Sequence, residues 1–399
     1  MELVCPVKMY HWGKVGLQSL VANLKKSSDE SFQINHNETY AELWIGTHPN
    51  GPAMLKNNDI LLEKWLLQHS HTLGEKVQRS FGNNLPFLLK ILSIGTPLSI
   101  QVHPSKEIAK ELHSKYPDIY KDSNHKPELA IALTTFEALC GFRPLDEIKK
   151  FFSNIPELSD LIGIEKVEKL LKSDEFSYKN NLKNCFESLI KASENIIKSK
   201  LELLLQRITS MDDSQDILGS LFIKIYHYYP GDVGCFCIYF FNYLILEPGE
   251  AIYLGSNEPH AYISGDCVEC MACSDNVVRA GLTPKFRDVD TLCRIINYKC
   301  DSAKSKILCP IVESEYSVIF KPPVSEFGVC RICVEPGNIY NITPRESGSV
   351  FIIINGTAKI QGIHVKKGQI FFFKQNEELQ VQVSQTKEPF LLFQAFVNI

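Results

Sequence analysis

The chain has 399 residues, of which 44% are hydrophobic and 22% charged, and its formal net charge is -4. Such a composition is typical of a globular protein with two or three domains, and it gives no reason to expect nucleic acid as a partner. No apolar run approaches the roughly 18 residues of a membrane span, and the first residues lack a signal-peptide pattern. We therefore expect a cytoplasmic protein without a membrane partner, whose 13 cysteines are reduced.

Three kinds of sequence follow one another along the chain. Residues 1–142 contain short apolar runs between turn signals, which predicts a mixed but strand-dominated region. From Asp146 to about His227, lysine-rich stretches with apolar residues at helical spacing predict a helical insertion. After Gly231 strands are expected again up to the C-terminus, with Asn355-Gly356 as a strong hairpin signal.

A weak internal similarity links residues 248–254 with residues 367–373, because a glycine precedes a hydrophobic run in both. At the same offset His260 aligns with Leu379, so the second copy lacks the imidazole. A true repeat predicts a C-terminal region with the same architecture and no metal. The alternative is that two unrelated turn-and-strand units look alike, since glycine before an apolar run is a common turn pattern.

Three short segments present polar side chains at alternate positions, which a strand would place on one face. They are Ser99, Gln101 and His103; Lys126 and Glu128; and His260 and Tyr262. If the segments meet, two imidazoles, a carboxylate and an amide oxygen converge on one pocket. That is a plausible nitrogen and oxygen set for a divalent metal, so the sequence indicates a metalloenzyme.

The cysteines at 267, 270 and 273 superficially suggest a metal knuckle. After the turn-forming residues 264–266, however, the segment is better interpreted as a strand, in which Cys270 faces away from the other two. Three thiolates then cannot converge, and structural thiols are expected. Glu269 shares a face with Cys267 and Cys273, in apolar surroundings that raise the pKa of a carboxyl group by desolvation.

Seven segments carry specific motifs in a fixed order. They are 12–14 (WGK), 41–49 (AELWIGTHP), 85–90 (LPFLLK), 101–104 (QVHP), 124–128 (NHKPE), 136–144 (FEALCGFRP) and 278–285 (VRAGLTPK). Together they resemble the signatures of the type I mannose-6-phosphate isomerase family. The resemblance is dense over residues 8–144 and 245–295, thin in the helical insertion, and only architectural in the last hundred residues. Val102 and Ser105 depart from the family's usual residues, with consequences only for local packing.

The resemblance implies a mainly β fold with two cupin-type jelly-roll barrels and an inserted α-helical domain. The expected boundaries are 1–145 and 234–300 for the two parts of the catalytic cupin domain, 146–233 for the helical insertion, and 301–399 for a C-terminal jelly roll without metal. The resemblance also implies one zinc ion per chain, and the family's site residues are carried over by position. The metal ligands are Gln101, His103, Glu128 and His260; the catalytic residues are Arg279, Glu269, Lys126 and His125; the substrate-binding residues are Ser99, Lys285 and Tyr262.

The implied reaction interconverts mannose-6-phosphate and fructose-6-phosphate by moving a proton between carbons 1 and 2 through an enediol. It supplies mannose for nucleotide-sugar and glycan synthesis, and we expect a monomer with a sugar phosphate as its small-molecule partner. Zinc with one anionic ligand keeps a net positive charge that stabilises the enediol. Arg279 and Lys285 are expected to bind the phosphate. Glu269 is the first choice for the base, with His125 or Lys126 as competitor.

Two other functions remain open at this point. His103, Glu128 and His260 also satisfy the two-histidine, one-carboxylate set of an iron oxygenase. An oxygenase needs open metal positions and no phosphate clamp, which the additional Gln101 and the cationic pair argue against. A non-catalytic sugar-binding or storage cupin is the second alternative, and it would not need Lys126 and Glu269 to face the metal.

Overall fold

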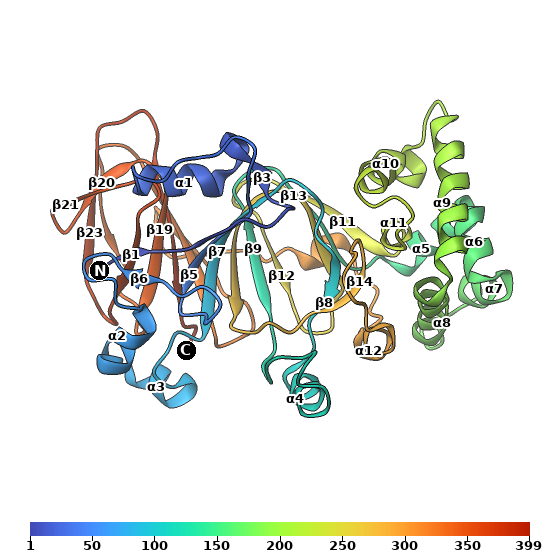
Figure 1. Cartoon of the computed structure of the whole chain (residues 1–399), viewed down its shortest axis with the longest axis horizontal. Coiled ribbons are helices and arrows are strands. Elements are labelled where there is room, and N and C mark those ends of the chain that lie inside the picture. Colours follow the sequence, from blue (N-terminus) through green and yellow to red (C-terminus); the bar gives the residue numbers. More distant parts are fainter.

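The computed structural model describes residues 1–399. Helices of residues 145–228 lie at one end of the long axis, strands of residues 311–396 lie at the other, and further strands lie between them (Figure 1). Helix accounts for 31% of the chain and strand for 30%, so the protein combines sheets with a helical region and is less dominated by strands than the sequence suggests. No helix is both long enough and apolar enough to cross a membrane.

The middle of the molecule is a ten-stranded sheet. Its main path runs through β11 (Phe241–Leu246), β10 (Phe136–Phe142), β13 (His260–Ala272), β7 (Phe87–Ile94), β5 (Glu42–Gly46) and β2 (Val7–Lys8). Off this path, β12 (Ala251–Leu254) pairs with β9 (Glu128–Ala132), and β14 (Val278–Gly281) pairs with β8 (Ile100–Val102). Because β8 and β9 both pair with β13, this long strand gathers segments that are far apart in the chain.

The C-terminal region forms two further sheets. One contains, in spatial order, β15 (Ile311–Val312), β16 (Ser317–Phe320), β17 (Gly328–Val334), β24 (Phe390–Phe396), β19 (Ser349–Asn355), β22 (Ile370–Phe373), β1 (Glu2–Val4) and β6 (Met54–Leu55). The other contains β18 (Ile339–Ile342), β23 (Leu379–Val383), β20 (Thr357–Ile360) and β21 (Ile363–Lys366), and a small separate ribbon pairs β3 (Lys14–Val15) with β4 (Thr39–Tyr40). Two N-terminal strands thus complete a sheet of the C-terminal region.

The helices fall into an N-terminal group, the predicted insertion and a late group. The first group is α1 (Leu20–Ser28), α2 (Leu62–Gln68), α3 (Glu75–Phe81) and α4 (Lys106–Lys115). The insertion contains α5 (Leu145–Asn154), α6 (Pro156–Ile162), α7 (Ile164–Leu171), α8 (Tyr178–Lys191), α9 (Glu194–Thr209) and α10 (Gly219–Tyr228), followed by α11 (Gly234–Cys237) and α12 (Val289–Ile295). The helical insertion is confirmed, whereas the four N-terminal helices lie in a region for which the sequence indicates mainly strands.

Helix α4 shows how local chemistry places a site residue. The Ser105 hydroxyl accepts a hydrogen bond from the Ile108 backbone N–H, which caps the helix directly after His103 and Pro104. The serine therefore performs the capping role that Asp or Asn would perform at this position. The cap ends the β8 segment at a defined place and holds the His103 backbone there.

Two large hydrophobic cores join the regions. One core of 34 residues includes Leu89 and Leu129 of the central sheet together with Val329 and Phe393 of the C-terminal sheet. Another core of 44 residues joins the helical insertion to β8, β10 and β14. Burial of apolar area on this scale is the main favourable term in folding, and it fixes the relative positions of the three regions.

The Asn355-Gly356 hairpin prediction is wrong. Gly356 has a positive φ of 83°, as a turn of this kind requires, but β19 and β20 on either side of it belong to different sheets. The chain crosses from one sheet to the other at this glycine. The true hairpin follows at once, where Gln361 and Gly362, with φ of 48° and 78°, connect β20 to β21 in the two-residue turn that favours such angles.

Strand β13 changes its pairing partner halfway along. Its first residues pair with β10, and the residues from Gly265 onward pair with β7 and β9. Gly265 has a φ of 112°, and a Cβ atom there would lie 2.6 Å from the Thr135 carbonyl oxygen. Tyr262 before this glycine and Glu269 after it line the same cavity. In a regular strand, two residues seven positions apart would face opposite sides. The pairing with β10 shifts at this point, because Glu137 pairs with Ser264 and Ala138 with Tyr262, and the extra residue Ile263 is a bulge that resets the strict alternation of the strand just before Gly265.

Candidate active site

Strands β8, β9 and β13 bring three potential metal ligands together. His103 follows β8, Glu128 begins β9 and His260 begins β13. One ligand atom from each residue lies within 4.8 Å of the others, and all three residues are buried. The strand register explains the convergence, because His260 is paired with Gln101 on β8, two positions before His103.

Backbone carbonyls orient both imidazoles. His103 Nδ1 lies 2.7 Å from the Asn276 carbonyl oxygen, and His260 Nδ1 lies 3.0 Å from the Glu258 carbonyl oxygen. A carbonyl can only accept, so each Nδ1 carries the proton and each Nε2 is left with a free lone pair. This is the usual outer-sphere arrangement that prepares a histidine for metal binding.

Buried atoms without partners mark the metal position. His103 Nε2 and His260 Nε2 each lie 3.3 Å from a Glu128 carboxylate oxygen. Neither nitrogen makes a hydrogen bond, and the same holds for Glu128 Oε2. Buried polar atoms without partners are costly, and a cation among them would satisfy all three. The residues present therefore fit a divalent metal, with Gln101 at the wall of the adjoining cavity as a further oxygen donor.

The protonation states of these residues suit metal binding. Burial lowers the pKa of His103 to about 4, so its imidazole is neutral near pH 7. Burial alone would raise the pKa of Glu128, but the charge of Lys126 is the main opposing effect, and that pKa lies well below its usual range. A neutral imidazole and an ionised carboxylate are the forms that coordinate metals.

A cavity of about 460 Å³ adjoins the three ligands. The predicted site residues on its wall are Ser99, Gln101, Lys126, Glu128, Tyr262, Glu269, Arg279 and Lys285. Trp12, Trp44 and His48, which belong to the motifs 12–14 and 41–49, also line it. Segments separated by more than 200 residues therefore line one cavity. Of the eleven site residues that the sequence analysis names, eight are on its wall.

Two cations in the cavity have no acidic partner. Arg279 on β14 is half-buried and Lys285 is exposed, and neither side chain takes part in a salt bridge or hydrogen bond. Burial lowers the pKa of Arg279, although a guanidinium stays charged at any physiological pH. Lys126 is closer to the metal ligands, with its Nζ atom 3.3 Å from Glu128 Oε1. An anion could be bound where Arg279 and Lys285 face the cavity.

The sequence analysis missed Lys90 as a site residue. Its ammonium group lies 2.9 Å from Glu269 Oε2 and 3.8 Å from Glu42 Oε2, and its side chain is 8% exposed. It also lies over the Trp44 ring, 5.4 Å from the centroid. One signal could have revealed it, since residue 90 is the one charged position in strand 87–94, whose other residues except Ser93 are apolar.

His125 lies in a different place from the other candidates. It is absent from the cavity wall, and its Nε2 atom lies 2.7 Å from Glu326 Oε1 in the C-terminal region. Its neighbour Lys126 lines the cavity. Successive side chains in an extended segment point to opposite sides, which explains why Lys126 faces the cavity while His125 faces the C-terminal region.

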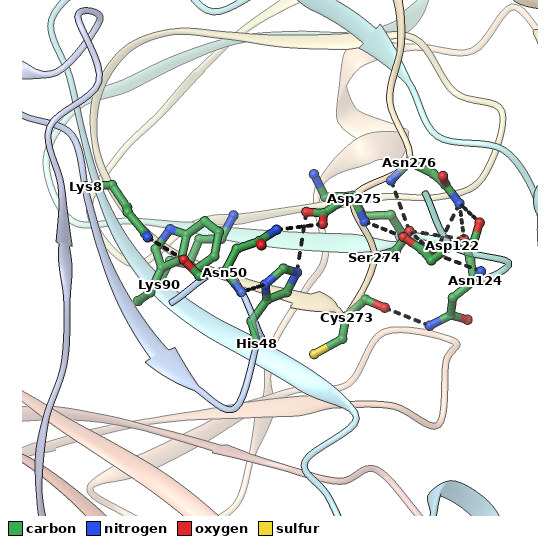
Figure 2. A network of polar contacts seen from close by, with 12 residues as sticks. Lys8, His48, Asn50, Lys90, Asp122, Asn124, Cys273, Ser274, Asp275 and Asn276 are labelled. Carbon is green, nitrogen blue, oxygen red and sulfur yellow. Dashed lines mark hydrogen bonds and ion pairs between the residues drawn. The ribbon is translucent and has the colours of Figure 1, made fainter. Parts of the chain in front are cut away.

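The loop between β13 and β14 forms a polar network with the cavity wall (Figure 2). The Asp275 carboxylate lies 3.4 Å from His48 Nε2 and accepts a hydrogen bond of 2.9 Å from Asn50 Nδ2. The charge and hydrogen bond of His48 lower the pKa of Asp275. No motif near His48 or Asp275 predicts this pair, because the two loops meet only in the folded chain.

The next residue of the same loop, Asn276, connects the network to His103, and Figure 2 shows its contacts with Asp122 and Asn124. Asn276 Nδ2 donates hydrogen bonds of 2.7 Å to the Asp122 carbonyl oxygen and 2.9 Å to the Asn124 carbonyl oxygen. Its own carbonyl oxygen accepts the bond from His103. One buried asparagine thus holds both a metal ligand and the segment that leads to Glu128.

Comparisons with known proteins agree with this geometry. Residues 1–145 match the family described as phosphomannose isomerase type I, catalytic domain, and residues 161–241 match its helical insertion domain. The mannose-6-phosphate isomerases of Homo sapiens and Macaca fascicularis are each 44% identical to this chain over 98% of it and 97% of their own length.

Solved structures give the same result. A mutant phosphomannose isomerase from Salmonella typhimurium superposes with a TM-score of 0.87 at 27% identity, over 100% of this chain and 99% of that one. Sequence and fold therefore agree along almost the whole length, and the chain belongs to the type I phosphomannose isomerase family.

Proposed function

We propose that this protein interconverts mannose-6-phosphate and fructose-6-phosphate through an enediol, with one zinc ion bound by Gln101, His103, Glu128 and His260. The observation that carries the proposal is a buried His-Glu-His group with unsatisfied ligand atoms beside a cavity that contains two unpaired cations. Zinc at this position would polarise the sugar oxygens and stabilise the negative charge of the enediol.

Arg279 and Lys285 bind the phosphate in this proposal, with Ser99 and Tyr262 as further substrate contacts. The two cations have no protein anion to neutralise them, and a phosphate dianion provides the missing charge. Phosphate bound at this end of the cavity holds the sugar chain so that carbons 1 and 2 reach the metal end. Binding energy from a remote group is then available to orient the reacting atoms.

Glu269 is the proposed base, with Lys126 and His125 retained as competitors. It removes the proton from carbon 2 of the open-chain aldose and returns it to carbon 1, while the proton of the carbon 2 hydroxyl moves to oxygen 1. Burial raises the pKa of Glu269 against the opposing charge of Lys90, which brings the group closer to neutral pH. A base whose pKa lies nearer the working pH transfers protons more efficiently. Lys126 is the nearer competitor because it lines the cavity, whereas His125 does not.

We also infer that the two strand-rich regions are cupin-type jelly rolls, with a catalytic domain formed by residues 1–145 and 234–300, a helical insertion of residues 146–233 and a metal-free C-terminal roll of residues 301–399. The antiparallel pairing of every named strand pair supports this architecture. Strands β1 and β6 cross the proposed boundary, since they extend the C-terminal sheet.

An enzyme-linked assay of fructose-6-phosphate to mannose-6-phosphate conversion tests the function. Activity should disappear on chelation and return with zinc. In deuterium oxide, an enediol intermediate allows solvent deuterium to enter at carbon 1 or 2 of recovered sugar, whereas a hydride shift does not. Bound iron together with oxygen consumption would replace the isomerase proposal with an oxygenase.

A further inference from the structure

Glu326 belongs to the C-terminal region but lies against the catalytic segment that contains His125. It is part of the connection between β16 and β17, residues 321–327. Asn398 Nδ2 donates hydrogen bonds to the Pro322 and Val324 carbonyl oxygens, and Phe327 is fully buried in the core shared by the central and C-terminal sheets. The backbone on both sides of Glu326 is therefore held in place.

The Glu326 carboxylate is buried and has one close partner. Its Oε1 atom lies 2.7 Å from His125 Nε2 and 3.9 Å from Lys106 Nζ, and its side chain is 6% exposed. A buried carboxylate is costly unless it is paired and hydrogen-bonded. His125, which is 201 residues away in sequence, supplies that hydrogen bond, so the fold brings a C-terminal anion to this particular imidazole.

His125 is part of a short segment with no regular secondary structure, residues 124–127, which contains Lys126 and leads directly to Glu128. Lys126 follows it directly and lines the cavity, and Glu128 begins β9 beyond the proline. On one side the Asn124 amide donates to the Cys273 carbonyl oxygen at 3.0 Å. Among the side chains of this segment, His125 alone makes a hydrogen bond or ion pair with the C-terminal region.

We propose that Glu326 is a positioning residue for the isomerase reaction, holding Lys126 and Glu128 in place through its hydrogen bond to His125. The inference rests on the proposed site roles of Lys126 and Glu128, and it assigns the C-terminal region a direct part in shaping the active site. His125 is then an outer support of the segment, and its imidazole does not touch the substrate.

Glu326→Ala tests this proposal against Glu346→Ala, which removes an exposed carboxylate of the same region that pairs with Lys76. Loss of an outer-sphere partner typically costs about 10- to 100-fold in activity or metal affinity. We expect kcat to fall by roughly tenfold or more for Glu326→Ala, with a smaller change in KM, and no change for Glu346→Ala. Glu326→Gln, which still accepts a hydrogen bond, should recover most of the activity. Equal kcat for the two alanine variants would overturn the proposal.

A double-mutant cycle with His125→Ala separates positioning from a general loss of stability. If Glu326 acts through His125, the double variant should be no slower than the single variants, because both remove the same interaction. Additive losses would contradict the proposal. Should Glu326→Ala fail to fold, Glu326→Asp replaces it, since the shorter carboxylate cannot reach His125 and kcat should again fall; an unchanged kcat overturns the proposal.

Zinc affinity provides a readout that does not depend on turnover. Chelator competition should show roughly tenfold weaker zinc binding by Glu326→Ala than by Glu346→Ala, because Glu128 belongs to the supported segment. If the native chain binds zinc but does not isomerise the sugar phosphate, the proposed function is refuted and the Glu326 proposal is not. The comparison of zinc affinities then still decides the role of Glu326.

Discussion

Lys90 illustrates how single residues shape this site. Burial lowers its pKa, but the charges of Glu269 and Glu42 outweigh that effect and raise the pKa above its ordinary value. The ammonium group therefore stays charged beside Glu269. The Glu269 carboxyl group is itself buried and close to Glu128, and its pKa is raised despite Lys90. Lys90 thus holds the proposed base in a fixed position and keeps the pKa of Glu269 from rising further.

Replacement of Glu269 by glutamine should lower kcat by roughly 100-fold or more, because the amide keeps the shape of the side chain and loses the basic oxygen. Zinc content, measured by elemental analysis, should stay normal. The exposed Glu247→Gln serves as the matched control and should retain native turnover. Near-native activity of Glu269→Gln, combined with inactivity of Lys126→Met, would place the base on the segment 124–128.

The pH profile follows from the direction of the Glu269 shift. A carboxyl group with a raised pKa becomes protonated, and therefore inactive as a base, at a higher pH than an ordinary glutamate near about 4.3. We expect the acidic limb of log kcat to lie above that value, measured with zinc retention monitored at each pH. An acidic limb at or below the ordinary value would exclude Glu269 as the base.

Arg279→Ala should cost about 2 to 5 kcal/mol of transition-state stabilisation with mannose-6-phosphate, since the phosphate loses its partner in a partly desolvated site. The loss should be much smaller with unphosphorylated mannose, which we expect to be a poor substrate of the native protein. The ratio of kcat/KM for the two sugars measures the effect directly. An unchanged ratio would remove Arg279 from the phosphate site.

At the scale of single elements, β13 contributes most to the site. Its first residue is a proposed metal ligand and its tenth is the proposed base, and β8, β9 and β7 all pair with it. Both side chains face one site because the bulge at Ile263 lies between them, directly before Gly265 with its positive φ. The position of Glu269 relative to His260 therefore depends on this bulge and on the close approach of Gly265 to Thr135.

Gly265→Ala and Gly163→Ala form a matched pair that tests this dependence. The two glycines have similar φ values of 112° and 101°, but a Cβ atom at Gly163 meets nothing within 4 Å, whereas one at Gly265 would collide with the Thr135 carbonyl oxygen. Gly163→Ala should cost about 1 kcal/mol of unfolding free energy from backbone strain alone. Gly265→Ala should cost more and also lower kcat. Denaturant unfolding and the isomerase assay measure both effects, and equal losses for the two variants would show that the strand can adjust.

At the scale of the whole molecule, the regions are not independent parts. N-terminal strands β1 and β6 extend the C-terminal sheet, and a common core of 34 residues joins that sheet to the central one. A second core joins the helical insertion to β8 and β14, next to Gln101 and Arg279. The active site is therefore held by packing from both ends of the molecule.

Because the ligands come from packed strands, removal of zinc should leave the chain folded while lowering its thermal stability. A ligand that binds only the native state at 100 times its Kd stabilises it by about 2.7 kcal/mol. Calorimetry should show a lower Tm after chelation that returns with zinc, together with activity. Unfolding of the chelated chain at room temperature would contradict this expectation.

The sequence by itself determined much of this protein. Alternation along short strands and the family motifs predict Gln101, His103, Glu128 and His260 as ligands, and helical spacing predicts the insertion. These features depend on neighbours within a few residues, so local periodicity reveals them. The structure brings three of the ligands together and places the fourth on the wall of the adjoining cavity.

Only the tertiary structure decided the rest. The ion pairs of Lys90 with Glu42 and Glu269, the contact of His125 with Glu326 and the crossing of the chain between sheets at Gly356 all depend on which strands lie side by side. The strongest local hairpin signal gave the wrong partner for the same reason. Turn residues determine local backbone angles, whereas the partner of a strand is determined by burial of its faces against segments hundreds of residues away.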